Sequence, residues 1–145
     1  DHFKSFNDNY GHQVGDQVLV EFAQLLKNNV RDTDLVARYG GEEFVVVLPE
    51  TDSGQAGAIA EKLRRRVMNH KIARPGTTPL SITSSFGVGY GCPDHTVWTT
   101  MLKAADDALY QAKEHGRNCV VTARQSCNLP IDSPKMPPSV EFKPS

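Results

Sequence analysis

The chain has 145 residues, of which 39% are hydrophobic and 23% are charged, a composition that suits one globular domain with its own core. A formal net charge of −1 gives no electrostatic reason to expect a nucleic-acid or membrane surface. Three cysteines without paired spacing argue against a disulfide framework and a zinc site, and no apolar run approaches the roughly 20 residues of a membrane span. We therefore expect a cytoplasmic domain with no nucleic-acid partner.

The opening segment "DHFKSFNDNYGHQVGD" is too polar and too punctuated to be purely structural. We expect a bent helix-loop-helix entry that aims Asn7, His12 and Asp16 at one pocket. An amide beside a carboxylate can read a purine edge such as that of guanine, because the carboxylate accepts from two adjacent N–H groups while the amide donates and accepts. Each residue also has a structural alternative: Asp16 as a helix cap, His12 as a surface residue, and Asn7 as a partner of local backbone.

A helix and a polar connection follow the opening segment. Residues 18–30 have apolar side chains at helical spacing, and Asp16 is placed to cap the start of that helix. "RDTD", residues 31–34, then ends the helical pattern. On its own, an exposed arginine-aspartate pair at this place would contribute little to stability.

The segment "DLVARYGGEEFVVVLP" predicts a tight hairpin. Gly40 and Gly41 separate two β-prone segments and are expected to form the turn, because such turns need the positive φ angles that glycine allows. Glu42 and Glu43 then lie where a strand begins whose remainder is apolar enough to be buried on both faces. Two carboxylates fixed at the rim of a rigid sheet are well placed to bind a metal ion.

The remaining pattern alternates helices and strands. Residues 54–70 and 96–116 show helical spacing, the latter ending at Gly116. Residues 80–91 alternate as a strand with one face of small side chains, which would let a neighbouring element pack closely. "NCVVTA" predicts a short last strand.

These elements predict an α+β domain over residues 1–123, with a sheet layered with helices on one side or both. Residues 124–145 contain five of the nine prolines and are expected to be a disordered tail or linker. The chain opens without an initiating Met or a disordered lead, which indicates a fragment of a longer protein. A strand before residue 1 would complete the sheet.

Three segments in this order and spacing, "FKSFNDNYGHQVGD", "RDTDLVARYGGEEF" and "YQAKEHGRN", resemble the GGDEF diguanylate cyclase domain in the GGEEF variant of its signature. The resemblance covers residues 1 to about 122. It implies a central β-sheet flanked by helices, similar to nucleotidyl cyclase and polymerase palm domains and truncated here at the N-terminus. It also implies the condensation of two GTP molecules into cyclic di-GMP with release of pyrophosphate.

The resemblance assigns catalytic roles to the hairpin acids and to the start of the chain. Glu42 matches the signature acid that binds Mg²⁺ or Mn²⁺ and is commonly assigned as the proton acceptor, and Glu43 matches a second acid at the turn. Because neighbouring strand residues point to opposite faces, Glu42 ranks above Glu43 as a metal ligand. Lys4, with the backbone near Phe3, matches the position that binds phosphate and stabilises the transition state.

Substrate contacts also carry over from the family. Asn7, His12 and Asp16 match guanine-side and ribose-side contacts, and Lys113 and Arg117 match the cations that hold the terminal phosphates. The structural alternative for the two cations is solvation of a helix end, where positive charge also suits the helix dipole.

Arg31 and Asp34 match the family's RxxD site for product inhibition, with five residues between Asp34 and Gly40. A guanidinium can fork onto phosphate or guanine while an aspartate accepts from guanine N–H groups. Lys62 occupies about the place where some family members have an assisting arginine.

The family usually opens with D-x-D-x-F-K, in which the first aspartate binds metal and the next residue contributes a backbone carbonyl. This chain begins at the second aspartate, Asp1, so half of the metal site lies outside the sequence. We expect the parent protein to be an active homodimer arranged by an upstream sensory or dimerising domain, either cytoplasmic or anchored to a membrane with this domain in the cytoplasm.

Two alternatives remain open at this point. One is an inactive GGDEF-type receptor that binds cyclic di-GMP or GTP and signals through its contacts. The other is a cyclase or polymerase-like enzyme for a different nucleotide. The intact substrate and metal residues argue against the receptor, and the pairing of Asn7 with Asp16 favours guanine over adenine.

Overall fold

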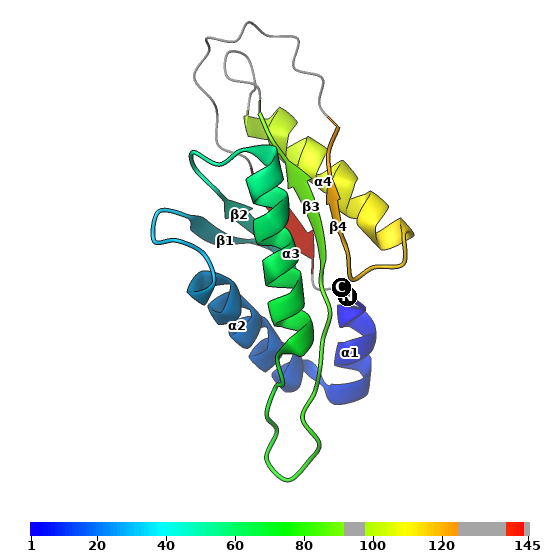
Figure 1. The fold of residues 1–145 in the computed structure, drawn as a ribbon. Helices are drawn as coiled ribbons and strands as arrows, with labels where there is room; N and C mark the ends of the chain where they lie inside the picture. Colours follow the sequence, from blue (N-terminus) through cyan, green and yellow to red (C-terminus); the bar gives the residue numbers. More distant parts are fainter. Residues whose placement is uncertain (92–97, 125–138, 144–145) are drawn as a thin grey trace, which may run out of the picture.

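The computed structural model describes residues 1–91, 98–124 and 139–143 (Figure 1). Their strands form one five-stranded sheet in the order β1-β2-β5-β3-β4. Helices α2 and α3 cover one face of the sheet and α4 covers the other, which confirms the predicted α+β architecture. In chain order the elements are α1 (Phe3–Tyr10), α2 (His12–Asn28), β1 (Leu35–Gly40), β2 (Glu43–Val47), α3 (Ser53–Asn69), β3 (Ser85–Gly89), α4 (Trp98–Glu114), β4 (Val120–Thr122) and β5 (Ser139–Lys143).

Two helices form the predicted bent entry and meet at Gly11. The N–H of Gly11 donates to the carbonyl oxygen of Asn7 at 2.8 Å and ends α1. Gly11 then takes a φ of 84°, in the left-handed region that glycine adopts without strain, and α2 starts at His12. The expectation that Asp16 caps α2 is wrong, because α2 begins one turn earlier and places Asp16 inside the helix.

The hairpin forms as predicted, but its turn is shifted by one residue. Gly40 pairs with Glu43 across the hairpin, so the turn residues are Gly41 and Glu42, and Glu42 is not in the strand. The register of β1 shifts between Arg38 and Gly40, and neither turn-region glycine has a positive φ. The guanidinium of Arg38 closes the turn by donating two hydrogen bonds to the carbonyl oxygen of Gly41, from Nε at 2.9 Å and from Nη2.

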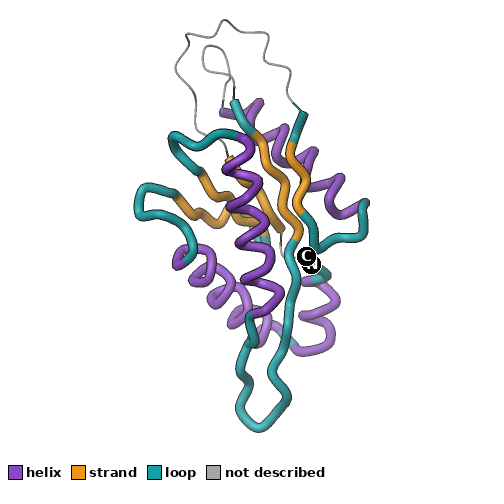
Figure 2. The backbone as a smooth tube through the Cα atoms, viewed as in Figure 1, coloured by secondary structure: helices purple, strands orange, loops and turns teal. Residues whose placement is uncertain are grey.

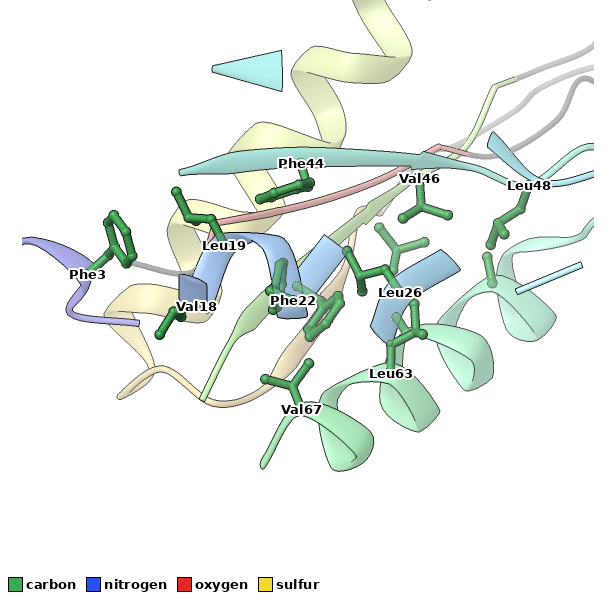
Figure 3. Packing of buried hydrophobic residues seen from close by; sticks show 14 of the residues in the cluster. Phe3, Val18, Leu19, Phe22, Leu26, Phe44, Val46, Leu48, Leu63 and Val67 are labelled. Atoms are coloured by element: carbon green, nitrogen blue, oxygen red, sulfur yellow. The ribbon is translucent and has the colours of Figure 1, made fainter. Parts of the chain in front are cut away.

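The main core lies between the sheet and helices α2 and α3 (Figure 3). Phe22 of α2 meets Phe44 of β2 edge to face, with 5.2 Å between ring centroids. A fully buried side chain of this kind stabilises the fold by about 1.5–3 kcal/mol. Inward-facing residues of α2, α3, β2 and β3 make up the rest of the cluster, among them Val18, Leu26, Val46, Leu63, Val67, Phe86 and Val88.

The opposite face of β3 is lined by small residues and packs against α4. A Cβ atom on Gly87 would lie 2.1 Å from the carbonyl oxygen of Ala105, and one on Gly89 would lie 2.5 Å from that of Met101. The predicted close-packing face is therefore confirmed. The strand is shorter than predicted, since it begins at Ser85, and Leu80 instead forms an isolated bridge with Ile72.

The other predicted helices are confirmed, and so is the short strand predicted from "NCVVTA", which the structure has as β4. A capping box starts α3, in which the Asp52 side chain accepts from the Gln55 N–H and Gln55 Oε1 accepts from the Asp52 N–H. Beyond the end of α4, Gly116 has a φ of 101°. Within the described ranges, no helix combines the length and apolarity needed to cross a membrane.

Strand β5 runs between β2 and β3 and is antiparallel to both. The strands of the sheet are the orange segments of Figure 2. Residues 139–143 belong to the segment expected to be a disordered tail, so for these five residues the expectation differs from the structure. The physical reason is that β2 and β3 each offer an edge of unpaired backbone groups, and residues 139–143 contain no proline to prevent pairing. The remainder of the predicted tail, 125–138 and 144–145, lies outside the described residues.

Candidate active site

The first residue is anchored where α1 begins, beside β3. The Asp1 carboxylate accepts hydrogen bonds from Thr83 Oγ1 at 2.8 Å, from Ser85 Oγ at 2.6 Å and from the Asn118 N–H at 3.1 Å. The α-amino group of Asp1 donates to the Thr83 carbonyl oxygen at 2.6 Å. These contacts attach the start of α1 to the sheet and to the loop that follows α4.

Three predicted site residues lie close enough to Asp1 to affect the charge of its α-amino group. Burial lowers the pKa of the Asp1 α-amino group to about 4, and the positive charges of Lys113 and Arg117 act in the same direction. The negative charge of Glu42 acts in the opposite direction. The signature acid and both predicted phosphate-binding cations therefore lie within electrostatic range of the start of α1, although they come from the hairpin and from the end of α4.

The start of α1 itself is suited to bind phosphate. Its first helical hydrogen bond joins the Phe6 N–H to the His2 carbonyl oxygen, which leaves the N–H groups of Phe3, Lys4 and Ser5 without partners inside the helix. Such groups, together with the helix dipole, attract anions. Phe3 is buried and holds this end of α1 against the core, while the Lys4 side chain is exposed.

Asn7 lies on α1 directly over Gly15 of α2. A Cβ atom on Gly15 would be 1.8 Å from Asn7 Oδ1, so this side chain has its present position because residue 15 is glycine. Asn7 Oδ1 is buried and has no hydrogen-bond partner within the described part of the chain. Sequence reasoning missed Gly15, for which the available signal was a glycine inside a helical pattern.

Asp16 follows Gly15 and is exposed in a pocket of about 490 Å³ that Arg38 and Phe44 of the hairpin also line. Because α2 begins at His12, Asp16 does not cap this helix, and its exposed carboxylate is available to a ligand. His12 is exposed at the first residue of α2. The amide thus belongs to α1 and is buried against Gly15, whereas the carboxylate of Asp16 belongs to α2 and faces the pocket beside the hairpin, and His12 lies at the start of α2.

The acidic turn offers a partial metal site. Glu42 and Glu43 are both half-buried, one in the turn and one at the start of β2. Among residues 1–91, 98–124 and 139–143, no three Asp, Glu, His or Cys side chains gather closely enough to hold a metal. Mg²⁺ is commonly held by one or two carboxylates together with substrate phosphates and water. The hairpin acids fit that limited role.

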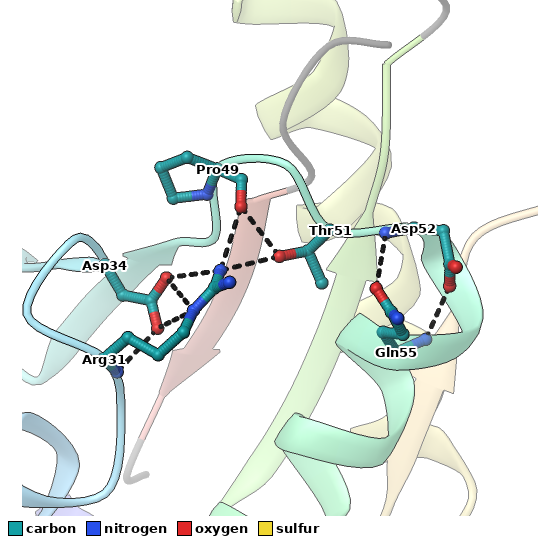
Figure 4. Close-up of polar contacts among 6 residues, drawn as sticks. All are labelled: Arg31, Asp34, Pro49, Thr51, Asp52 and Gln55. Atoms are coloured by element: carbon teal, nitrogen blue, oxygen red, sulfur yellow. Dashed lines mark hydrogen bonds and ion pairs between the residues drawn. The ribbon is translucent and has the colours of Figure 1, made fainter.

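The predicted product site lies apart, between the end of α2 and the start of α3 (Figure 4). Arg31 and Asp34 are paired through three side-chain contacts, and the shortest joins Arg31 Nη2 to Asp34 Oδ1 at 2.9 Å. Arg31 Nη2 also donates to the Pro49 carbonyl oxygen and to Thr51 Oγ1, each at 2.9 Å. Hydrogen bonding to Asp34 raises the pKa of Arg31.

The two members of this pair differ in access. The Arg31 side chain is 53% exposed, whereas that of Asp34 is 1% exposed. A bound ligand can therefore reach the guanidinium, but the Asp34 carboxylate is covered by its own arginine. Lys62 on α3 lies nearby, since its Nζ donates to the carbonyl oxygen of Asn29 at 3.2 Å.

The domain thus combines a mixed sheet with an acidic turn and two cations that lie within electrostatic range of a helix start. The family described as "Diguanylate cyclase, GGDEF domain" matches residues 1–119. This chain belongs to the GGDEF domain family.

Named relatives agree with this assignment. The response regulator PleD of Caulobacter vibrioides is 46% identical over 122 residues, which are 83% of this chain and 27% of PleD. Diguanylate cyclase A of Treponema denticola is 42% identical over 130 residues, 90% of this chain and 34% of the relative. The chain therefore spans about a quarter to a third of the length of these relatives.

A solved structure confirms the fold. The GGDEF domain of DgcB from Caulobacter crescentus, determined in complex with c-di-GMP, superposes with a TM-score of 0.80 at 36% sequence identity. The match covers 86% of this chain and 72% of that domain.

Proposed function

We propose that this domain is the catalytic domain of a diguanylate cyclase, which condenses two GTP molecules into cyclic di-GMP and releases two pyrophosphates. The proposal is carried by the hydrogen bond that joins the Asn118 N–H, next to Arg117, to Asp1 at the start of α1, together with the electrostatic effect of Glu42, Lys113 and Arg117 on that residue. A carboxylate with two cations and a helix start is the combination that a metal-bound triphosphate requires. Membership of the family and the names of the relatives support the same reaction.

Each part of the site has a role in that reaction. Asn7 and Asp16 bind the guanine edge, with His12 on the ribose side. Lys113, Arg117 and the first turn of α1 at Phe3 and Lys4 hold the phosphates.

The chemistry takes place at the α-phosphate. The 3′-hydroxyl oxygen of one GTP forms a bond to the α-phosphorus of the other while the bond from that phosphorus to the pyrophosphate oxygen breaks. Glu42, assisted by Glu43, would hold the Mg²⁺ or Mn²⁺ ion, whose chemistry when bound is to neutralise charge on the phosphates. Glu42 also accepts the hydroxyl proton, and Lys4, Lys113 and Arg117 stabilise the charge that develops on the leaving pyrophosphate.

Turnover needs two copies of the domain. Each copy holds one GTP, and two sites facing each other across a twofold axis bring each 3′-hydroxyl to the partner's α-phosphate. We infer that an upstream sensory or dimerising region of the parent arranges this homodimer, and that the domain works in the cytoplasm.

Product inhibition is proposed at Arg31. The exposed guanidinium can fork onto a phosphate or a guanine of cyclic di-GMP, with Lys62 as an additional cation. Because Asp34 is covered by Arg31, it can accept from guanine N–H groups only after Arg31 turns away from it. The cyclic di-GMP complex of the DgcB domain supports a product site in this family.

The second candidate is a receptor that binds cyclic di-GMP without turnover. One observation favours it: the described residues bring no three metal-ligating side chains together. The two candidates differ in whether GTP is consumed.

The test compares this chain with a version extended before Asp1 by a strand that ends in the family's Asp-x pair. Both are incubated with GTP and Mg²⁺, and products are separated by chromatography. The cyclase proposal predicts cyclic di-GMP from the extended chain, and loss of turnover with retained GTP binding in its Glu42→Gln variant. Binding of cyclic di-GMP with no turnover by the extended chain would favour the receptor.

A further inference from the structure

We propose that Asp1 is a positioning residue, whose carboxylate, together with Ser85, holds the turn at Arg117 and Asn118 so that Arg117 faces the terminal phosphates of the nucleotide. The inference rests on the proposed function, because it assigns the triphosphate as the ligand of Arg117. Asp1 itself acts through the turn and does not contact the substrate.

The turn after α4 is held in a conformation that its residues disfavour. Arg117 has a φ of 66° and Asn118 a φ of 47°, so two successive residues with side chains occupy the left-handed region. Asparagine tolerates this region better than most residues, but arginine does not share that tolerance. Such backbone persists only where surrounding contacts determine it, and it is concentrated at functional sites.

The contacts that hold the turn come from Asp1 and Ser85. The Asn118 N–H donates to Asp1 Oδ2 at 3.1 Å and to Ser85 Oγ at 3.2 Å. The Ser85 hydroxyl donates in turn to Asp1 Oδ1 at 2.6 Å. Ser85 is fully buried, which fixes this triangle of hydrogen bonds on the sheet.

A second set of contacts holds Asn118 from the side of α3. Arg64 Nη1 donates to Asn118 Oδ1 at 2.8 Å and to the Asn118 carbonyl oxygen at 3.3 Å. Arg64 is itself paired with Glu61, with Nη2 and Oε1 2.7 Å apart. The residue after Arg117 is therefore fixed on both sides, and little freedom remains for the backbone of Arg117.

Arg117 presents a donor that a ligand can use. Its Nε atom is buried and has no hydrogen-bond partner among the described residues. Leaving a buried donor unpaired is unfavourable, and a guanidinium N–H pairs best with carboxylate or phosphate oxygens. Lys113 lies one helical turn earlier and adds a second cation next to the same place.

Two other roles for Asp1 fit the contacts less well. A helix cap is one, but the residue before α1 is His2, and α1 has no side-chain cap hydrogen bond. A metal ligand is the other, but both carboxylate oxygens of Asp1 already accept hydrogen bonds from Thr83, Ser85 or Asn118. The observed contacts are those of a residue that fixes backbone.

The test uses the Asp1→Asn variant and isothermal titration with a non-hydrolysable GTP analogue and with GMP. An asparagine at this place puts an N–H group where the Asp1 carboxylate accepts hydrogen bonds, and an N–H group cannot accept from another donor. We therefore expect the turn to be released and the GTP analogue to bind about tenfold more weakly. Binding of GMP, which lacks the terminal phosphates, is expected to change less than about twofold. Removing a negative charge without moving Arg117 would instead strengthen triphosphate binding.

Controls separate positioning from general damage. Asp8→Asn makes the same change of charge on an exposed face of α1 and is expected to leave both affinities unchanged. Ser85→Ala, which removes no charge, is expected to weaken binding of the GTP analogue to the same extent as Asp1→Asn. Arg117→Ala combined with Asp1→Asn is expected to lose no more affinity than Arg117→Ala alone.

Several results would overturn the inference. One is an equal loss of affinity for GMP and for the GTP analogue in Asp1→Asn. The others are losses of affinity that add up in the double variant, and unchanged binding of the GTP analogue in Asp1→Asn. A wild-type chain that binds no guanine nucleotide would instead refute the proposed function. Hydrogen exchange of the Asn118 amide gives a readout without nucleotide: Asp1→Asn should expose this amide while α4 stays protected, and unchanged protection would refute the positioning role.

Discussion

Replacing Gly15 with alanine tests how the Asn7 amide, which we propose binds the base, is held in place. Gly15 lies inside α2 without a positive φ, so an alanine fits its backbone. Judged by helix propensity alone, the change would stabilise the protein by about 1 kcal/mol. The new Cβ atom would, however, lie 1.8 Å from Asn7 Oδ1 and 2.9 Å from Asn7 Cγ. The Asn7 side chain must therefore leave its present position.

The expected effect on binding is larger than the effect on stability. Loss of the Asn7 amide removes one or two hydrogen bonds to the base, which corresponds to about 1–3 kcal/mol, or roughly 5- to 150-fold in Kd. For the free energy of unfolding, the gain in helix propensity is offset by an overpacking cost of about 1–3 kcal/mol. We expect a net change between zero and about 2 kcal/mol of destabilisation.

The assay is titration of GMP into wild-type, Gly15→Ala and Gly57→Ala chains, with urea unfolding of all three. Gly57 is a matched control, since it also lies inside a helix and its Cβ would meet only Thr122 Oγ1 at an ordinary 3.5 Å. We expect Gly57→Ala to bind GMP normally and to be stabilised by up to about 1 kcal/mol. A Gly15→Ala chain that binds GMP like wild type would refute the placement of Asn7 over Gly15.

Three further predictions concern other parts of the molecule. In a rate assay of the extended chain with added cyclic di-GMP, Arg31→Ala is expected to abolish product inhibition and to leave the initial rate unchanged. Inhibition that persists in this variant would contradict the proposed product site. The pKa of Glu61 is lowered from 4.5 to about 2, chiefly by its hydrogen bond from Arg64. The contribution of Glu61 to the free energy of unfolding is therefore complete above pH 4.5, the pKa of this carboxyl in the unfolded chain, and it is lost as the pH falls from about 4.5 to 2. Glu61→Gln should flatten the stability profile in that window, and an identical acid profile for both chains would show that the ion pair is not responsible. Truncation after Arg124 removes β5 and leaves β2 and β3 with unpaired edges, so we expect a lower urea midpoint and concentration-dependent association in light scattering; an unchanged midpoint would mean that β5 adds no stability.

Local patterns predicted most of the fold. Helix α3 was predicted from its apolar spacing, which involves neighbours in the chain, and the structure adds the Asp52 capping box at its start. The glycine face of β3 predicted a close neighbour, which α4 provides. The hairpin was predicted too, but its turn was placed one residue early, because the register shift before Gly40 depends on pairing across the hairpin and not on the glycines themselves.

Contacts between distant segments could not be predicted. Asp1 meets Ser85 and Asn118 only after the sheet has formed, and no sequence pattern joins them. Strand β5 was missed because prolines dominate its surroundings, while its pairing depends on edges supplied by β2 and β3. Motif spacing predicted the site residues themselves. The contacts that hold them in place, such as Gly15 beneath Asn7, are seen only in the structure.

The most direct measurement is a crystal structure of this chain with a non-hydrolysable GTP analogue and Mn²⁺. The account predicts the guanine at Asn7 and Asp16, the terminal phosphates between the start of α1 and Arg117, and the metal at Glu42. A nucleotide bound elsewhere, or one whose phosphates lie away from Glu42 and Arg117, would contradict the central claim that these residues form one GTP site.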